Sequence, residues 1–305
     1  MKRVLTALVL IPLVLLAVFK APSWLFTLLV GAVALLALKE YLDLVEAYGV
    51  KPIRWLTYVV SLLYILRFML YDDTAHHWIG LALNAVGIDG SRLLVALIAL
   101  DWLIPFLFLI AAMRSPELRT AFARAASSMF GVMYVVCSLL LLARLQSHGW
   151  FVVVFTFIAV WAGDTVAMYV GKAIGRHKMS PRISPGKTWE GAVGSVIGSV
   201  AFCWLIWKFA ERINDALVLH FTERGHDLPS VLHPLPELTI WSVLVIAIVL
   251  NIAAQLGDLV ESLIKRGANV KDSGTMLPGH GGILDRIDAL LFAAPVALIL
   301  FEFVR

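Results

Sequence analysis

Long apolar segments recur along the whole chain, and they constrain its fold more than any other feature. A helix needs about 20 apolar residues to cross a bilayer. Segments near that length cover 4–19, 23–42, 55–71, 93–113, 127–145, 150–171, 191–208, 238–257 and 285–303. The chain is also 61% hydrophobic and only 15% charged, whereas about a quarter of the residues of a soluble domain are charged. The sequence therefore predicts an all-α polytopic membrane protein with about nine transmembrane helices.

Lys and Arg are distributed unequally between the loops that join these segments. If the N-terminus lies inside, most of them fall in inner loops, as is typical of cytoplasmic loops. We therefore expect a cytoplasmic N-terminus and an outward C-terminus. The same rule accounts for the net charge of +4 without a nucleic-acid partner. We expect residues 1–125 to form N-terminal transmembrane helices and residues 126–305 to form a transmembrane catalytic region.

Ionisable side chains interrupt the apolar pattern where the eighth segment ends. Each such group at or inside the hydrocarbon costs roughly 2.5–3.5 kcal/mol, so a dense group of them is expected to face a polar cavity and bind a ligand. If the helix continues to Arg266, then Asp258, Ser262 and Lys265 share one face. Asp285 and Asp288 are three residues apart and also share a face where the next segment starts.

This stretch contains the side chains that a metal ion and a nucleoside triphosphate require. Carboxylates from two helices can hold Mg²⁺ together with substrate phosphates. The glycine-rich turn at 278–282 leads into a helix start, where bare backbone and free N–H groups favour anions. Positive charge for polyphosphate comes from Lys265, Arg266, Lys271 and Arg286. The alternative is a juxtamembrane loop whose charges only set topology, which explains the basic residues but not Asp272, Asp285 and Asp288.

A second polar cluster lies between the sixth and seventh segments. Asp164 stands inside an otherwise apolar segment, so it is a candidate for a site, for pairing with a Lys, or for a partner on a neighbouring helix. The turn Ser184-Pro185-Gly186-Lys187 can present its Lys to a phosphate. Glycines at 191, 194 and 198 are typical of close helix packing rather than chemistry.

The stretch from Ser262 to Asp288 resembles the signature of the phosphatidate cytidylyltransferase (CDP-diacylglycerol synthase) family. It reads S-L-I-K-R, four residues, then K-D-S-G-T-M-L-P-G-H-G-G-I-L-D-R-I-D. Ser184 to Gly191 is similar to the family's Ser-Pro-x-Lys-Thr-Trp-Glu-Gly element, with Gly186 where a Lys is common. Asp164, Tyr169 and Gly171 are similar to its Asp…Tyr…Gly stretch. The resemblance covers about 164–288, and only the hydrophobic segments agree before it.

The resemblance implies that CTP and phosphatidic acid react to give CDP-diacylglycerol and pyrophosphate. It also implies dependence on Mg²⁺, with a second cation left open, and assembly as a homodimer. The enzyme would be integral to the cell (inner) membrane, with its active site on the cytoplasmic side.

The same resemblance implies roles for individual residues. Asp258 and Asp285 would hold the metal ion, and basic side chains would neutralise the phosphates of CTP and lipid. The expected catalytic residues are Lys187, Lys265, Arg266, Asp272, His280 and Arg286. The expected substrate-binding residues are Asp164, Ser184, Lys187, Ser262, Lys265, Arg266, Lys271, Gly281, Gly282, Arg286 and Asp288. We expect His280 to bind phosphate or support the turn rather than act as a base.

Two other functions remain open from the sequence. The first is the same reaction on another lipid phosphate, such as an ether lipid or a polyprenyl phosphate. The second is a secondary transporter, which would spread its ionisable residues over several helices near mid-bilayer. Here they gather at the inner ends of segments six to nine, which favours the enzyme.

Overall fold

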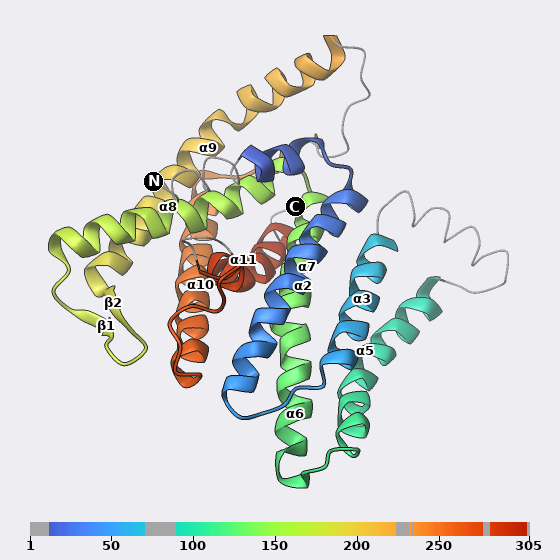
Figure 1. Cartoon of the computed structure of the whole chain (residues 1–305). Coiled ribbons are helices and arrows are strands. Elements are labelled where there is room, and N and C mark those ends of the chain that lie inside the picture. Colours follow the sequence, from blue (N-terminus) through green and yellow to red (C-terminus); the bar gives the residue numbers. More distant parts are fainter. Residues whose placement is uncertain (1–11, 71–89, 224–231, 233–234, 277–280, 304–305) are drawn as a thin grey trace. The chain divides into compact units, whose positions relative to one another are not determined.

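The computed structural model describes residues 12–70, 90–223, 232, 235–276 and 281–303, and these residues form helices apart from one two-stranded hairpin (Figure 1). The chain divides into two compact units. One comprises Met1–Phe26 together with Leu141–Arg305, and the other comprises Thr27–Leu140. The predicted all-helical class is therefore confirmed. The predicted start of a catalytic region at residue 126 stays a prediction.

The Thr27–Leu140 unit is a set of apolar helices around a small core. Its elements are α2 (Ser23–Ala47), α3 (Arg54–Leu70), α5 (Gly90–Ala112), α6 (Leu118–Gly131), the π-helical η1 (Val132–Cys137) and the start of α7 (Ser138–Gln146). Phe108 of α5 and Val132 of η1 are buried in this core together with Val60 of α3. Helices α6, η1 and α7 follow one another without a break, so they form one long apolar rod from 118 to 146.

The larger unit contains every element that carries a predicted site residue. Its elements after α7 are α8 (Trp150–Ile174), β1 (Lys178–Ser180), β2 (Ser184–Thr188), α9 (Trp189–Glu223), α10 (Ile240–Gly267) and α11 (Leu284–Phe303). Figure 1 shows α8 and α9 side by side, joined at one end by the β1–β2 hairpin. The C-terminal end of α10 extends through Arg266, so the predicted continuation of this helix is confirmed.

Small residues let α8 and α9 approach each other closely. A Cβ added to Gly194 would lie 2.8 Å from Val170 Cγ2, and one added to Gly198 would lie 2.5 Å from Val166 Cγ2. Bulkier residues at these positions would push the helices apart, as at other close helix crossings in membranes. The predicted packing role of the α9 glycines is therefore confirmed.

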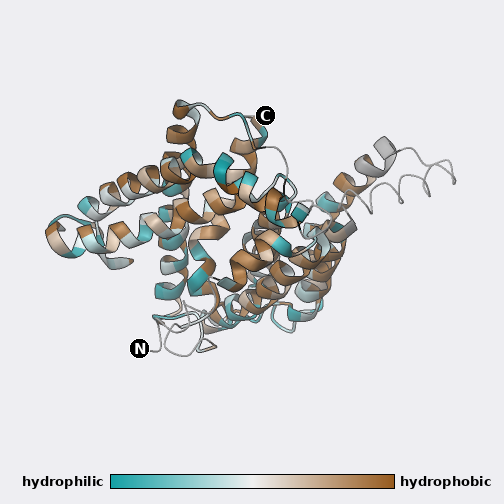
Figure 2. Cartoon of the chain, turned by 90° about the horizontal axis from the view of Figure 1, so that it is seen from above, coloured by the Kyte–Doolittle hydropathy of each residue, from teal (hydrophilic) through white to brown (hydrophobic). Residues whose placement is uncertain are grey.

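Within the residues that the structure describes, six helices are long and apolar enough to cross a membrane. They cover Ser23–Ala47, Val95–Ala112, Leu118–Gln146, Trp150–Ile174, Trp189–Glu223 and Ile240–Gly267. Figure 2 shows that hydrophobic residues make up much of the helices. The chain is thus a polytopic integral membrane protein. The first predicted segment lies partly outside the described residues, and a total of nine spans stays a prediction.

Two segment boundaries were wrong. The fifth apolar segment was expected to begin at 127, but its helix begins at Leu118. The seventh apolar segment was expected to end at 208. Instead α9 continues as a helix to Glu223. Helical hydrogen bonding does not require an apolar sequence, so the loss of hydrophobicity after 208 marked the end of the apolar stretch and not the end of the helix.

Candidate active site

The β1–β2 hairpin positions Lys187 beside α10. The strands pair antiparallel, with Lys178 opposite Thr188 and Ser180 opposite Ser184. Lys187 extends from β2, and its Nζ lies 2.7 Å from Asp258 Oδ2 and 3.5 Å from the carbonyl oxygen of Gln255. The predicted turn at 184–187 was wrong, since these residues belong to strand β2, but the segment does present Lys187, which contacts a predicted metal ligand on α10.

Thr188 fixes the end of this hairpin against both long helices. Its side chain is buried, and its Oγ1 accepts a hydrogen bond of 3.1 Å from the backbone N–H of Gly191 at the start of α9. A Cβ on Gly175, just after α8, would lie 2.7 Å from the same oxygen. The absence of side chains at these glycines therefore lets Thr188 lock the hairpin between α8 and α9.

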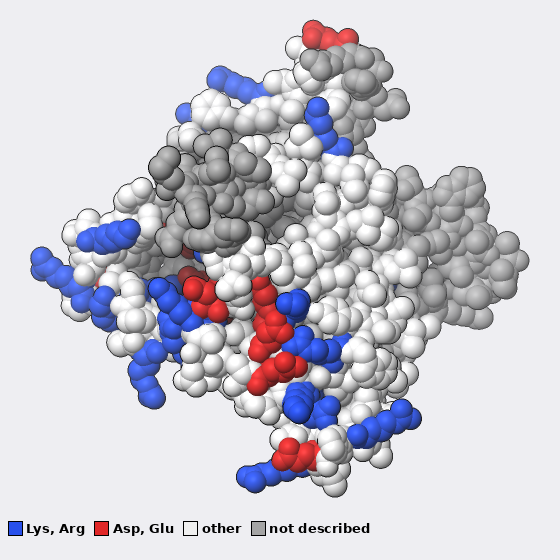
Figure 3. Space-filling model, viewed as in Figure 1, with Lys and Arg blue, Asp and Glu red and all other residues white. Residues whose placement is uncertain are grey.

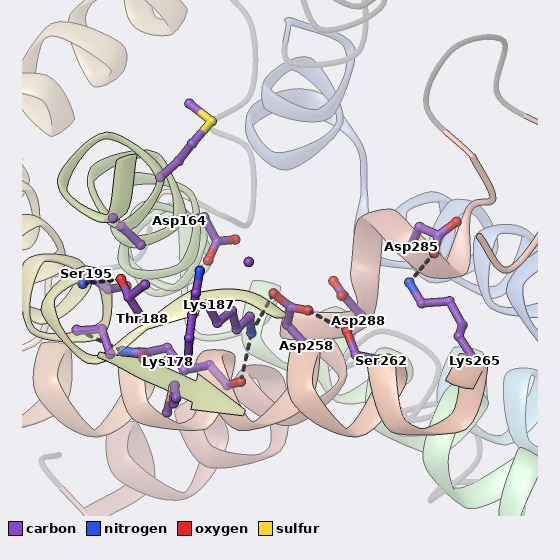
Figure 4. Close-up of a pocket in the computed structure, with 18 of the residues that line it drawn as sticks. Asp164, Lys178, Lys187, Thr188, Ser195, Asp258, Ser262, Lys265, Asp285 and Asp288 are labelled. Carbon is purple, nitrogen blue, oxygen red and sulfur yellow. Dashed lines mark hydrogen bonds and ion pairs between the residues drawn. The ribbon is translucent and has the colours of Figure 1, made fainter. Parts of the chain in front are cut away.

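A cavity of about 720 Å³ opens between the hairpin and helices α8, α9, α10 and α11 (Figure 4). Its lining includes most of the predicted site residues. These are Asp164, Lys187, Asp258, Ser262, Lys265, Arg266, Lys271, Asp272, Asp285, Arg286 and Asp288. Of the other predictions, Ser184, Gly281 and Gly282 are not part of the lining, and His280 lies outside the described residues. Figure 3 shows Lys and Arg gathered around the hairpin, while much of the visible helix surface is uncharged.

Three carboxylates from three helices face one part of this cavity. Figure 4 shows Asp164 of α8, Asp258 of α10 and Asp288 of α11 directed toward the same region. Gly257 makes this approach possible, because a Cβ there would lie only 2.7 Å from the carbonyl oxygen of Asp288. Ser262 Oγ donates to Asp258 Oδ1 at 3.4 Å, which confirms that these two residues share a helix face. Among the described residues, Lys187 forms an ion pair with Asp258, whereas Asp164 and Asp288 form none.

A second charged group is buried at the base of the loop between α10 and α11. Lys265 Nζ lies 2.5 Å from Asp285 Oδ1 and also forms an ion pair with Glu261. The side chain of Glu261 is fully buried. The other oxygen of Asp285 accepts hydrogen bonds from the backbone N–H groups of Ser273 at 2.9 Å and Gly282 at 2.8 Å. Asp285 thus ties the loop to the start of α11.

Gly281 serves this same contact. Its φ is 79°, and a Cβ would lie 2.6 Å from Asp285 Oδ2, so both conformation and space require a glycine. Gly281 and Gly282, both predicted to bind substrate, are therefore adjacent to the carboxylate of Asp285. Their predicted contact with substrate stays a prediction.

Arg266 connects two segments beside the cavity. Its Nε donates to the carbonyl oxygen of Ile183 in the hairpin turn at 3.2 Å, and its Nη1 donates to that of Val270 at 3.1 Å. Two N–H donors of Arg266, a residue expected to bind phosphate, therefore bind backbone carbonyl oxygens instead.

The sequence did not single out several residues that build this site. Asn251 on α10 is buried, donates to Ser195 Oγ at 3.0 Å, and accepts from Gln255 Nε2 at 2.7 Å. Ser195 and Gln255 line the cavity, as does Lys178. Polar residues inside apolar helices were the available signal for Asn251 and Gln255, and the four-residue spacing from Lys265 was the signal for Glu261.

Comparison with known proteins gives a family for this architecture. The model of a family described as "Cytidylyltransferase family" matches residues 1–304. The chain belongs to this family. The resemblance seen over 164–288 therefore extends across the apolar N-terminal helices as well.

Curated relatives agree with this membership. A phosphatidate cytidylyltransferase of Haemophilus influenzae is 32% identical over an alignment of 322 residues that covers 99% of each chain. One of Staphylococcus saprophyticus is 35% identical over 269 residues, which cover 88% of this chain and 86% of the relative. One of Staphylococcus epidermidis is 33% identical over 300 residues, which cover 98% and 97%.

Proposed function

We propose that this protein transfers a cytidylyl group from CTP to phosphatidate, giving CDP-diacylglycerol and pyrophosphate. The observation that carries the proposal is the single cavity in which carboxylates and basic side chains from α8, β2, α10 and α11 meet. Membership of the family and relatives named phosphatidate cytidylyltransferase support the choice of nucleotide and lipid.

The reaction needs positioning and charge neutralisation more than proton transfer. An oxygen of the lipid phosphate attacks the α-phosphorus of CTP, a new P–O bond forms, and the bond to the β-phosphate breaks as pyrophosphate leaves. The attacking oxygen is already anionic near neutral pH, so its main obstacle is repulsion from the triphosphate. Lys187, Lys271 and Arg286 line the cavity and would screen this repulsion and stabilise the departing pyrophosphate.

Mg²⁺ fits the carboxylates of this cavity. It usually takes one or two carboxylates together with water and substrate phosphates, and the described residues hold no group of three His, Cys, Asp or Glu close enough to bind an ion by themselves. Asp258 and Asp285 were the predicted ligands. Asp285 is held by Lys265 and by two backbone N–H groups, whereas the contacts of Asp258 among the described residues come from the side chains of Lys187 and Ser262, which can rotate away from an ion. We therefore propose Asp258 and Asp288 as metal ligands and Asp285 as their support. The ion would withdraw negative charge from the phosphates.

The setting in the membrane is proposed from the sequence pattern. The excess of Lys and Arg on one side supports an N-terminus and active site on the cytoplasmic face of the inner membrane. Nine spans and a homodimer remain part of this proposal. Another lipid phosphate, an ether lipid or a polyprenyl phosphate, is the alternative substrate.

Pyrophosphate release from the purified full-length protein tests the proposal directly. In detergent micelles with phosphatidate and Mg²⁺, we expect release from CTP and much less from GTP or dATP. Chelation with EDTA should stop the reaction, and excess Mg²⁺ should restore it. Equal rates with ether-lipid or polyprenyl phosphates would contradict the assignment of phosphatidate as the lipid substrate. No release with CTP and any lipid phosphate would overturn the proposed function.

A further inference from the structure

The β1–β2 hairpin is held in place at its base and at its turn. At the base, His177 Nδ1 lies 2.6 Å from Glu190 Oε1, and the backbone N–H of Trp189 donates to the carbonyl oxygen of His177 at 2.9 Å. At the turn, Arg266 of α10 donates to Ile183. The side chains that leave the hairpin toward the cavity therefore start from a fixed backbone.

Two lysines on this hairpin line the cavity, and they differ in what holds them. Lys187 is paired with Asp258 and also reaches the carbonyl oxygen of Gln255. Lys178 lies on the neighbouring strand, opposite Thr188, and is exposed within the cavity lining. Figure 4 shows its side chain extending into the cavity on the side of Asp164. In the part of the chain that the structure describes, no hydrogen bond or ion pair engages the Lys178 ammonium group.

A further positive charge lines the same cavity. Lys172 in the last turn of α8 also lines the cavity and is exposed. Like charges that line one cavity repel one another, and the contacts at the base and turn of the hairpin hold the backbone of Lys178 beside this cavity. An anion that enters the cavity would relieve the repulsion and supply the missing partner.

We propose that Lys178 binds a phosphate group of a substrate, in a subsite separate from the Lys187–Asp258 pair. The proposal rests on the proposed function, because that reaction brings two phosphate-bearing molecules into this cavity. The triphosphate of CTP and the phosphomonoester of the lipid share the chemistry that a lysine ammonium recognises.

Steady-state kinetics of Lys178→Met in the full-length protein test this subsite. A charge-assisted contact of this kind contributes about 10-fold to 100-fold in affinity, so we expect KM for one substrate to rise by at least about 10-fold. KM for CTP is measured at saturating phosphatidate, and KM for phosphatidate in mixed micelles at saturating CTP, so the two arms identify which phosphate is bound. Lys178→Arg keeps the charge and should restore most of the affinity.

Arg182→Met is the matched control. Arg182 lies in the same hairpin, is exposed, and loses the same charge, but it is not part of the cavity lining. It should leave both KM values unchanged. Unchanged KM values in Lys178→Met, or an equal rise in Arg182→Met, would overturn the subsite.

A binding measurement separates this proposal from the proposed function. Equilibrium dialysis with pyrophosphate, at equal Mg²⁺, compares wild type with Lys178→Gln in detergent without lipid. Weaker binding to the variant, with an unchanged thermal midpoint, supports the subsite even if no lipid is a substrate. Equal binding to both proteins counts against it.

Discussion

The two units of this protein treat charge within apolar helices in different ways. In the Thr27–Leu140 unit, Arg67 Nη1 lies 2.6 and 2.8 Å from the two carboxylate oxygens of Asp101, and the hydroxyl of Tyr64 donates to Asp101 at 3.1 Å. The charges of Arg67 and Asp101 are therefore paired with each other within the helices. In the larger unit, Asp164 and Asp288 face the cavity without an ion pair among the described residues, and the Lys178 ammonium group also has no partner there.

The difference separates charges that support the structure from charges that await a ligand. A closed pair offsets the cost of leaving water and contributes to helix packing. Charges that line an open cavity without complete pairing cost stability, and they persist where a bound ion or anion completes them. Substitutions of the incompletely paired charges in the cavity should therefore affect mainly activity. Substitutions of the closed Arg67–Asp101 pair should affect mainly stability.

Asp258→Asn should have the largest effect on activity. It removes the negative charge that pairs with Lys187 and that we assign to Mg²⁺. We expect kcat/KM to fall by about 100-fold to 1,000-fold, as for the loss of one preorganised electrostatic group. Pyrophosphate release measures this loss.

The thermal midpoint of Asp258→Asn in detergent should fall no more than that of Arg67→Met, since the two ion pairs are similarly exposed and Asn fills the same volume and still offers Lys187 an oxygen acceptor. Activity close to wild type at saturating Mg²⁺ would contradict the assignment of this carboxylate. Asp285→Asn should also abolish turnover, but through its contacts with the backbone N–H groups of Ser273 and Gly282, without unfolding of the protein.

Gly163→Ala should weaken both stability and activity. Its Cβ would lie 2.1 Å from Asn251 Nδ2 and 2.9 Å from Ser195 Oγ, so α10 must shift away from α8 or the buried hydrogen bond must break. Overpacking of this kind costs about 1–3 kcal/mol, and it also displaces Asp164 relative to Asp258. We expect a lower thermal midpoint and a several-fold lower kcat.

Gly186→Ala is the matched comparison for stability, because nothing lies within 4 Å of a Cβ at that position. Its thermal midpoint should equal that of wild type. An equal loss in both variants would show that the Asn251 contact is not the cause.

Arg67→Met should reduce stability but leave the activity of the folded protein unchanged. Asp101 would lose its partner, and one-sided loss of a partly buried pair costs a few kcal/mol at most, here reduced by solvent access. The double variant Arg67→Met/Asp101→Leu should recover part of the lost stability. A changed kcat/KM with an unchanged thermal midpoint would mean that this pair takes part in catalysis.

The sequence by itself determined the class of protein and most of the charged residues that line the cavity. Apolar segments predicted an all-helical membrane protein, because the bilayer imposes a minimum length and polarity on anything that crosses it. Ionisable residues at the ends of those segments predicted the cavity for the same reason, and Asp164, Lys187, Asp258 and Asp288 do meet there. The end of α9 was not predicted, because hydropathy indicates which residues can lie in a membrane and not where a helix ends.

Only the tertiary structure decided which charges neutralise one another. Lys187 and Asp258 are 71 positions apart, and Arg266 contacts Ile183 across 83 positions, so no local spacing could reveal either contact. The partners depend on how closely α8, α9, α10 and α11 approach, which glycines such as Gly194 and Gly257 set through the contacts that they permit. Charge type is written in the sequence, whereas the distance on which electrostatic energy depends is fixed only when the helices pack.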